Sequence, residues 1–337
     1  MANVKVVILN WNGMEHLKRF LPSVIATTPD NIEIVVADNG SDDGSPEMLA
    51  ELFPAVEVIR LDNNYGFAKG YNLALGPLDS DYFILLNSDV ETTPDWCGPL
   101  VAALDSDPDL IAVSPKIRSY GRKEYFEYAG AAGGFIDIFG YPFCRGRILS
   151  KVEKDNGQYD DARHIFWASG ACMACRKELF TEMGGFDGDF FAHMEEIDLC
   201  WRAQSRGYKI GIEPRSVVFH LGGGTLPNNS PRKIYLNYRN SLAMLYKNLP
   251  RRRFLPVFTV RIIFDFLSSA VYLLKGQPDF FKSVYKAHAD FYRWRNNGLR
   301  EKRAKILSSA TTKPEWMYRG SIVVRYFFGK RTFGNLL

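Results

Sequence analysis

The chain has 337 residues, of which 46% are hydrophobic; this is enough to bury one large core or two modest ones, and it excludes a disordered chain. The net charge of +4 is unevenly distributed. Residues 1–230 carry 20 basic and 33 acidic side chains, a balance of −13, and residues 231–337 carry an excess of +17. We therefore expect the two parts to face different surroundings.

The five cysteines are scattered along the chain, which favours a reducing cytoplasm over a secreted disulfide scaffold. Cys172 and Cys175 form a CxxC motif, but no second Cys or His pair lies near, so we interpret this segment as a buried strand and not as a zinc site. The apolar run near the N-terminus is too short for a signal peptide and lacks a cleavage site. We expect no export.

In the first hundred residues, β-branched apolar runs alternate with segments that can form helices. Continuous apolarity is typical of strands that are covered on both faces, so we predict an α/β fold with a mostly parallel sheet between helices. The predicted strands are residues 4–10, 32–40, 56–62 and 82–89.

Each of these four runs ends in a polar residue: Asn10, Asp38, Asp62 or Asp89. Ligands of open α/β sheets bind at the carboxyl ends of the strands, so these residues can converge on one crevice. The alternative is that Asp and Asn merely begin turns, as they commonly do. We favour a shared site because the pattern recurs four times.

The segment NWNGMEH at the end of the first strand excludes some classes of phosphate-binding site, because it contains a single glycine, Gly13. A dinucleotide fold would place GxGxxG there, and a Walker loop is also missing. A metal can replace a glycine cradle for phosphates. Asp89, with Asn87 two residues earlier, offers hard oxygen ligands for Mg²⁺ or Mn²⁺ beside a diphosphate.

A second acidic cluster begins a predicted helix, EEIDLCWRAQSRG, that comes after the aromatic pair Phe190–Phe191, which we predict to be buried. Acids in a first turn complement the helix dipole, and Asp198 with Arg202 is an ordinary ion pair. However, Glu195 and Glu196 are adjacent like charges in an aromatic setting. Desolvation and repulsion would raise a pKa toward the range of a general base.

A lone histidine, His220, ends the apolar run of VVFHLGGGT. A solitary histidine usually has a structural role. Because this one comes after a strand and precedes three glycines, it can alternatively supply an imidazole to the same cation, more naturally Mn²⁺ than Ca²⁺.

Six segments in this order resemble the family 2 inverting glycosyltransferases, especially the rhamnosyltransferase-like bacterial members: VVILNWNG, VVADNGSDDGS, NNYGFAKGYNLAL, LLNSDVE, ASGACMACRKELFTEMGGFDGDFFAHMEEIDLCWR and VVFHLGGGT. The likeness covers about residues 3–230. It implies the GT-A fold, with residues 1–230 as the nucleotide-sugar glycosyltransferase domain.

The resemblance also implies a set of nucleotide-binding residues and a metal site. The nucleotide-binding set is Asn10, Asn12, Asp38, Ser41, Asn64, Gly66, Phe67, Gly70, Asn87 and Ser88. The family's Asp-x-Asp metal motif has Asn87 at its first position here, so Asp89 is expected to carry most of the contact with Mg²⁺ or Mn²⁺. His220 matches a histidine that contacts the metal or the diphosphate.

The family's catalytic acidic pair falls on Glu195 and Glu196, which implies Glu196 as the general base and Glu195 as a reserve candidate. Trp167, Ser169 and Gly170 lie where similar enzymes line the acceptor side, with a packed strand edge as the alternative. The implied reaction is an inverting transfer from a nucleoside-diphosphate sugar, with dTDP-rhamnose as the best guess and UDP-hexoses open. The acceptor would be lipid-linked or polysaccharide, in cell-surface glycan synthesis; the alternative is a catalytically silent sugar-nucleotide-binding or scaffold subunit.

In the basic part, residues 254–274 are long enough to cross a bilayer, but Pro256, Arg261 and Asp265 interrupt them. We predict instead that residues 231–337 form basic amphipathic helices lying on an anionic membrane surface, which would make the protein cytoplasmic and peripheral on the inner face of the membrane. The alternative is a helical cap or a homodimer interface. We expect no nucleic-acid partner, because the catalytic part is acidic and lacks a recognised reading module.

Overall fold

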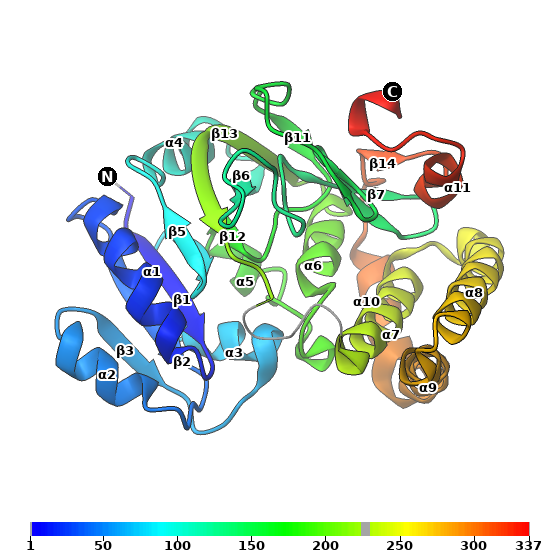
Figure 1. Ribbon diagram of the computed structural model, residues 1–337, viewed down its shortest axis with the longest axis horizontal. Coiled ribbons are helices and arrows are strands. Elements are labelled where there is room, and N and C mark those ends of the chain that lie inside the picture. Colours follow the sequence, from blue (N-terminus) through cyan, green and yellow to red (C-terminus); the bar gives the residue numbers. More distant parts are fainter. Residues whose placement is uncertain (1, 224–229, 337) are drawn as a thin grey trace.

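The computed structural model describes residues 2–223 and 230–336. The four strands predicted in the first hundred residues are confirmed. They are β1 (Val4–Asn10), β2 (Glu33–Asp38), β3 (Glu57–Arg60) and β4 (Tyr82–Asn87). They lie parallel in the order β3-β2-β1-β4, so their carboxyl ends meet at one edge of the sheet (Figure 1).

The helices α1 (Met14–Thr27), α2 (Ser45–Leu52) and α3 (Gly66–Leu75) connect these strands. Successive residues of β1 pack into different hydrophobic clusters: Val7 belongs to one cluster, and Val6 and Ile8 belong to the other. This is the consequence of alternating side-chain directions in a strand that is covered on both faces. The predicted arrangement of a sheet between helices is confirmed.

Beyond β4 the large sheet is mixed. It continues through β12 (Cys172–Arg176), β6 (Leu110–Ser119), β13 (Lys209–His220) and β11 (Arg163–Ile165), and β5 (Val90–Thr92) pairs with β13. β12 is antiparallel to both neighbours, and β6 is parallel to β13. The helices of this part are α4 (Gly98–Ser106), α5 (Glu178–Thr181) and α6 (Glu195–Gln204). Cys172 and Cys175 are free and buried in β12, as the strand interpretation predicted.

A second, smaller sheet was not predicted. It contains β7 (Gly134–Asp137), β8 (Pro142–Cys144), β9 (Arg147–Ile148), β10 (Lys151–Val152) and β14 (Met317–Tyr318). These strands are two to four residues long, too short to produce a clear period in the sequence. Since β14 is close to the C-terminus and pairs with β7, the end of the chain returns to the part formed by residues 1–230.

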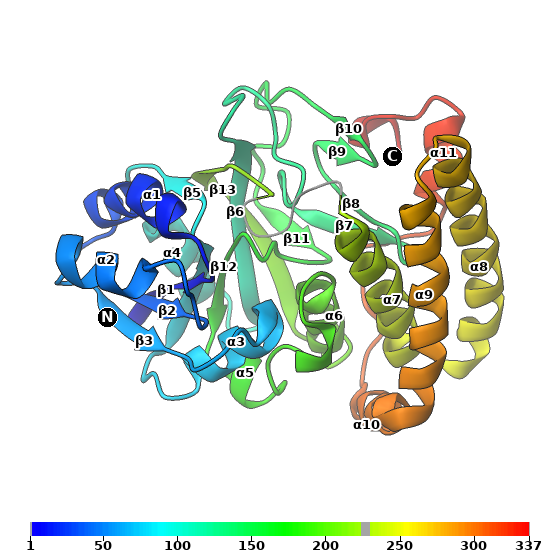
Figure 2. The same ribbon diagram turned by 60° about the horizontal axis from the view of Figure 1, so that its bottom comes forward.

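The predicted C-terminal helical region is present as α7 (Pro231–Asn248), α8 (Arg251–Leu274), α9 (Pro278–Trp294), α10 (Arg300–Ser309) and α11 (Ile322–Phe327). Figure 2 shows α7 between the sheet and the outer helices α8 and α9. Leu242, Leu245 and Phe291 belong to the same hydrophobic cluster as Val7 and Trp201, so one core crosses the expected boundary at residue 230. The division into domains at residue 230 therefore stays a prediction.

Candidate active site

A cavity of about 530 Å³ lies at the carboxyl ends of β1 and β4. Its walls come from segments far apart in the chain, including the start of α3, the start of α6, the end of β13 and the start of α7. Eleven of the predicted site residues line it. These are Asn64, Gly66, Phe67, Asn87, Ser88, Asp89, Ser169, Gly170, Glu195, Glu196 and His220.

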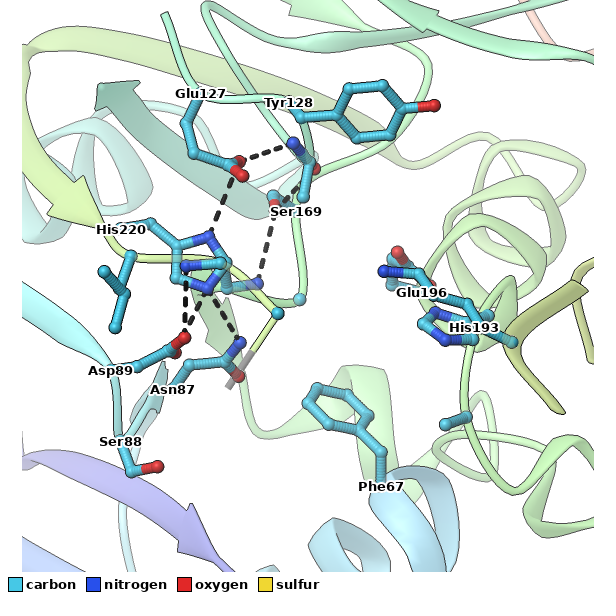
Figure 3. A pocket seen from close by; sticks show the side chains of 18 of the residues that line it. Phe67, Asn87, Ser88, Asp89, Glu127, Tyr128, Ser169, His193, Glu196 and His220 are labelled. Carbon is cyan, nitrogen blue, oxygen red and sulfur yellow. Dashed lines mark hydrogen bonds and ion pairs between the residues drawn. The ribbon is translucent and has the colours of Figure 1, made fainter. Parts of the chain in front are cut away.

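Strand pairing brings His220 and Asp89 together on one wall of this cavity (Figure 3). In the antiparallel pairing of β13 with β5, His220 is opposite Val90, the neighbour of Asp89. Nε2 of His220 lies 3.1 Å from Oδ1 of Asp89. The backbone N–H of Gly222 donates to Oδ2 of Asp89 at 3.2 Å, which fixes the other carboxylate oxygen. Asp89 itself lies in the turn after β4, whereas the sequence predicted it as the last residue of the strand.

Glu127 lies behind His220, and the sequence analysis missed it. Its Oε2 is 3.5 Å from Nδ1 of His220, on the side of the ring opposite Asp89. Burial by itself would lower the pKa of His220, but the carboxylates of Asp89 and Glu127 raise it to about 10. Glu127 belongs to no motif and to no predicted strand, so only the folded chain identifies it as part of the site.

The residues present fit a divalent cation. Asp89 offers an oxygen and His220 a nitrogen within 3.1 Å of each other, and the amide of Asn87 is 3.5 Å from Nε2 of the same ring. Glu127 is placed to orient the imidazole, as carboxylates do behind metal-binding histidines. Across residues 2–223 and 230–336, no group of three or more His, Cys, Asp or Glu side chains could hold a metal. Asp89 and His220 are the residues that would hold Mg²⁺ or Mn²⁺.

The first turn of α6 carries the two glutamates on the wall across from Asp89 and His220 (Figure 3). Burial, reinforced by the neighbouring Glu196 carboxylate, raises the pKa of Glu195 well above its ordinary range, and its side chain is 4% exposed. Burial also raises the pKa of Glu196, to about 7, while backbone N–H groups of the helix start lower it. Glu196 is partly exposed to the cavity. It is therefore the glutamate that can exchange a proton near neutral pH.

The chain before α6 has an unusual backbone. Phe191, His193 and Met194 have φ values of 65°, 71° and 75°, which cost roughly 1–3 kcal/mol each in residues other than glycine. Phe190 is buried as predicted, but Phe191 turns into the cavity, so the prediction that both rings are buried is wrong for Phe191. His193 also lines the cavity. Burial, together with the charge of Lys233, lowers its pKa to about 4, which keeps the imidazole neutral.

Gly66 and Phe67, at the start of α3, form the adjoining wall. Gly66 has a φ of 74°, and a Cβ atom there would lie 2.5 Å from the ring of Phe191, so a larger residue does not fit. Asn39, whose side chain donates to the carbonyl of Gly66 at 3.1 Å, also lines the cavity. Trp11 does so as well. Both are neighbours of predicted residues, and the sequence analysis missed them.

Several residues of the predicted nucleotide-binding set lie outside the cavity lining and hold its floor together. The side-chain amide of Asn10 donates to Asp38 at 3.1 Å and to Ser41 at 3.3 Å, and the backbone N–H of Asn12 donates to Ser41 at 2.9 Å. Asn10 and Asp38 are buried. Gly70 packs against Asn39. Their hydrogen bonds support the loops that carry Trp11 and Asn39.

The predicted convergence of the four strand-end residues is only partly correct. Asp89 lines the cavity, and Asn10 and Asp38 lie next to it. Asp62 is exposed and accepts a hydrogen bond from the hydroxyl of Tyr65 at 2.8 Å, as a turn residue does. It lies two residues beyond the end of the short edge strand β3, so it does not share the crevice.

On the expected acceptor side, Ser169 and Gly170 line the cavity and Trp167 does not. Trp167 is buried, and its indole N–H donates to the carbonyl of Phe135 at 2.8 Å. A Cβ atom at Gly134 would lie 2.1 Å from the indole ring, which shows how closely the two segments pack. Trp167 is therefore packed inside the protein, as the alternative interpretation stated, and it does not line the cavity on the acceptor side.

Three basic residues of the lining were missed by the sequence analysis: Arg122, Arg232 and Lys233. Arg232 and Lys233 begin α7, and the guanidinium of Arg232 lies 4.8 Å from the centre of the Phe191 ring. These positive charges oppose the acidic residues of the cavity and suit a bound diphosphate. In the sequence Arg232 and Lys233 belong to the region assigned to the membrane, and only the fold places them here.

Comparisons with known proteins identify a family and several similar chains. The model of the family named Glycosyl transferase family 2 matches residues 5–184. An N-acetylglucosaminyl-diphospho-decaprenol L-rhamnosyltransferase of Mycobacterium tuberculosis is 27% identical over 230 residues, covering 64% of this chain and 75% of the relative. Rhamnosyltransferase WbbL of Escherichia coli is 23% identical over 260 residues, covering 75% of this chain and 94% of the relative.

A solved structure with a similar fold is that of GalNAc-T7 with UDP, GalNAc and Mn²⁺. It aligns with a TM-score of 0.58 at 21% identity over 73% of this chain and 48% of that chain, so this chain spans about half of its length. The likeness concerns the fold, and it confirms the predicted GT-A type of architecture.

Proposed function

Because the chain belongs to glycosyl transferase family 2, we propose that it transfers a sugar, with inversion, from a nucleoside-diphosphate donor to a lipid-linked or polysaccharide acceptor in cell-surface glycan synthesis. One observation carries the proposal: Asp89 and His220 lie on one wall of a cavity and Glu196 lies on the opposite wall (Figure 3). This arrangement supports the proposed roles, in which the side of Asp89 and His220 receives the leaving diphosphate and Glu196 accepts a proton from the other side.

Rhamnose, carried by dTDP, is the proposed sugar. Two relatives that this chain resembles over most of their length are named rhamnosyltransferases, and one of those names includes a diphospho-decaprenol acceptor. We extend both features to this protein as a proposal. A polyprenyl diphosphate acceptor also suits an enzyme that works at a membrane surface.

The proposed reaction is a single displacement. The acceptor hydroxyl attacks the anomeric carbon, its oxygen forms the new bond, and the bond to the diphosphate breaks with its electron pair leaving on the diphosphate. Glu196 accepts the hydroxyl proton, an effect typically of 10²–10⁴-fold. Glu195 is more deeply buried than Glu196, and burial raises its pKa well above its ordinary range, so it is the weaker candidate.

The departing diphosphate needs positive charge around it. Asp89 and His220 would hold Mg²⁺ or Mn²⁺, which would offset the charge of the phosphates when bound. Arg122 and Arg232 line the same cavity and contribute fixed positive charge, which is usually the largest part of catalysis in such sites. Asn39 and Trp11 lie on the wall where the predicted nucleoside pocket adjoins the strand ends.

The proposed cellular location is the inner face of the cytoplasmic membrane, and α8 supports it. α8 is the described helix that is long and apolar enough to cross a membrane by length and composition. Two charged residues in the middle of the helix face inward: Arg261 is 4% exposed and pairs with Asp265, which also contacts His288. These buried ion pairs bond α8 to the rest of the protein and would be broken if the helix spanned a bilayer. They therefore favour a helix that stays packed on the protein.

The apolar face of α8 is turned outward. Leu267 is 61% exposed, and the residues that share this face are Leu255, Ile263, Phe266, Val271 and Leu274. Arg251, Arg252 and Arg253 are exposed at the start of the helix. α11 ends at Phe327, which is exposed together with the following Phe328, and it lies on the same side of the molecule (Figures 1 and 2). Exposed apolar residues flanked by arginines are typical of helices that lie in an anionic membrane surface.

The function is tested by a panel of nucleotide sugars, with and without Mn²⁺, and a short polyprenyl-diphospho-N-acetylglucosamine acceptor. We expect transfer of rhamnose from dTDP-rhamnose and product with inverted anomeric configuration by NMR. Transfer of another sugar would change the proposed identity of the donor and leave the proposed reaction unchanged. Binding of nucleotide without transfer or hydrolysis across the panel would instead indicate the catalytically silent subunit.

A further inference from the structure

The loop that precedes α6 has a strained backbone, which contacts from other parts of the chain must stabilise. Phe191 has φ 65° and ψ −64°, and the N–H of Ala192 donates to the carbonyl of Phe190 at 2.8 Å, which together define a tight γ-turn. His193 and Met194 come next with φ values of 71° and 75°. Residues other than glycine rarely adopt these angles, so three of them in four positions require neighbours that hold them.

Asn240 of α7 provides that support. It is 0% exposed, and its amide nitrogen lies 2.9, 2.8 and 2.8 Å from the carbonyl oxygens of Phe190, Ala192 and His193. The two N–H groups of one side chain thus serve three carbonyls of the loop. Buried carbonyls without a donor are costly, so the position of the loop depends on this amide.

Arg239 fixes which way the amide of Asn240 faces. Its Nε donates to Oδ1 of Asn240 at 2.9 Å, and its terminal nitrogen donates to the carbonyls of Asp189 and Phe190 at 3.0 and 3.1 Å. A guanidinium can only donate and the loop carbonyls can only accept. A flipped amide would lose the bond from Arg239 and the bonds to the three loop carbonyls, and therefore the orientation of Asn240 is set by its partners.

The supported loop connects both sides of the cavity. Toward α3, the carbonyl of Phe191 accepts a hydrogen bond from the N–H of Ala68 at 3.2 Å, and the Phe191 ring lies against Gly66. Toward α6, Met194 is the residue immediately before the helix, so the loop decides where α6 begins and where Glu196 lies. His193 and Glu196 share one wall in Figure 3.

We propose that Asn240, oriented by Arg239, is a positioning residue that holds the strained loop Phe190–Met194 so that the Glu196 carboxylate faces the reacting sugar. The inference rests on the proposed role of Glu196 as the base. It assigns to α7, in the basic C-terminal part, a role in catalysis that neither the family match over residues 5–184 nor any motif of the sequence includes.

The test compares Asn240→Ala with the wild-type chain, using dTDP-rhamnose, or the sugar nucleotide that the panel selects, and the polyprenyl-diphosphate acceptor. Because a displacement of about 1 Å at a reacting group can lower the rate by roughly 10²-fold, we expect kcat to fall by about that factor. The KM for the donor and the Kd for dTDP with Mn²⁺ should change less than about threefold, since Asp89 and His220 remain in place.

Asn248→Ala is the matched control. Asn248 is also a buried asparagine of α7, but it bonds Asp198 and the carbonyl of Met244 and does not touch the loop. It should lower thermal stability and leave kcat near the wild-type value. Equal losses of kcat in Asn240→Ala and Asn248→Ala would mean that α7 acts by general stability, and this would overturn the proposal.

Arg239→Lys decides the question if Asn240→Ala does not fold. Lysine keeps the charge but cannot donate from a planar fork to the amide and the carbonyls together. We expect about a tenfold lower kcat with unchanged dTDP binding, and a wild-type kcat would contradict the inference. Glu196→Gln distinguishes the failure of the proposed base from the failure of the positioning role. If Glu196→Gln remains fully active, Glu196 is not the base. If Glu196→Gln is inactive and Asn240→Ala is fully active, only the positioning role of Asn240 is refuted.

Discussion

Nε2 of His220, the last residue of β13, lies 3.1 Å from Oδ1 of Asp89, which lies in the turn between β4 and β5. The pairing of His220 with Val90 sets this distance, so the contact is built by backbone hydrogen bonds and does not depend on flexible loops. The two side chains can therefore bind one cation together, and the loss of either should weaken its binding.

Asp89→Asn and His220→Gln should each weaken Mn²⁺-dependent binding of dTDP by at least about tenfold and change metal-free binding little. Each variant removes one of the two donors that the structure brings together. Isothermal titration calorimetry with and without Mn²⁺ measures the effect. Asp62→Asn is the control, because Asp62 is an acidic residue that follows the edge strand β3 and lies outside the cavity. If all three variants behave alike, the pair is not a metal site.

Glu127→Gln should weaken the same Mn²⁺-dependent binding by about 10–100-fold, although Glu127 would not touch the ion. The carboxylate faces Nδ1 of His220 at 3.5 Å and makes the ring a stronger ligand, whereas the neutral amide would not. The same titration detects the change. Unaltered affinity in Glu127→Gln would show that His220 needs no partner behind it.

The rate of transfer should depend on pH through Glu196. Since burial raises the pKa of Glu196 to about 7 and the base must be ionised, kcat should rise with pH and reach half its maximum near pH 7. Glu196→Gln should lower kcat by about 10²–10⁴-fold, keep dTDP binding and abolish this pH dependence. A profile that is flat from pH 5 to 8 in the wild-type chain would argue against Glu196.

Glu196→Gln should also stabilise the fold at alkaline pH. The folded-state pKa of about 7 lies above the ordinary value of 4.5, so the wild-type chain loses stability as pH rises from about 4.5 to about 7. Above that window the loss amounts to about 3 kcal/mol. Urea unfolding should therefore show a gain for Glu196→Gln at pH 8 and little at pH 5. Glu178→Gln, on the exposed surface of α5, should show no such difference.

Membrane binding should depend on the outer surface of α8. Replacing Leu255 and Leu267 by Gln, or Arg251, Arg252 and Arg253 by Gln, should reduce cosedimentation with vesicles that contain phosphatidylglycerol. Each arginine near an anionic surface contributes about 1 kcal/mol, so the triple change should weaken binding by about 10²-fold at low salt. Leu52→Gln on α2 is the control, because Leu52 is an exposed leucine of another helix. Undiminished binding of both α8 variants would refute the membrane proposal.

Point substitutions suit this test better than truncation. α7, α8 and α9 contribute to the core that also contains Val7, and Lys247 of α7 pairs with Asp187 at 2.6 Å and Asp198 at 2.8 Å. Removing these helices would expose that core and leave buried carboxylates without a cation. A truncated chain would report on folding and not on membrane affinity.

The order of elements along the first hundred residues was accessible from the sequence, because buried parallel strands leave long apolar runs and their connecting helices do not. The same is true of Asp89, Glu196 and His220, which lie at ends of such elements within recognisable motifs. The second sheet was not accessible, because strands of two to four residues leave no periodic pattern.

Only the tertiary structure decided which predicted residues face the cavity and which unpredicted residues join them. Trp167 and Asp38 have suitable chemistry, but their hydrogen bonds are made inside the protein. Glu127, Arg232 and Asn240 belong to no motif, yet they stand beside His220, Phe191 and the loop before Glu196. The physical reason is that a residue's chemistry is local to the sequence, whereas burial and the partners of a side chain are set by segments that meet only when the chain folds.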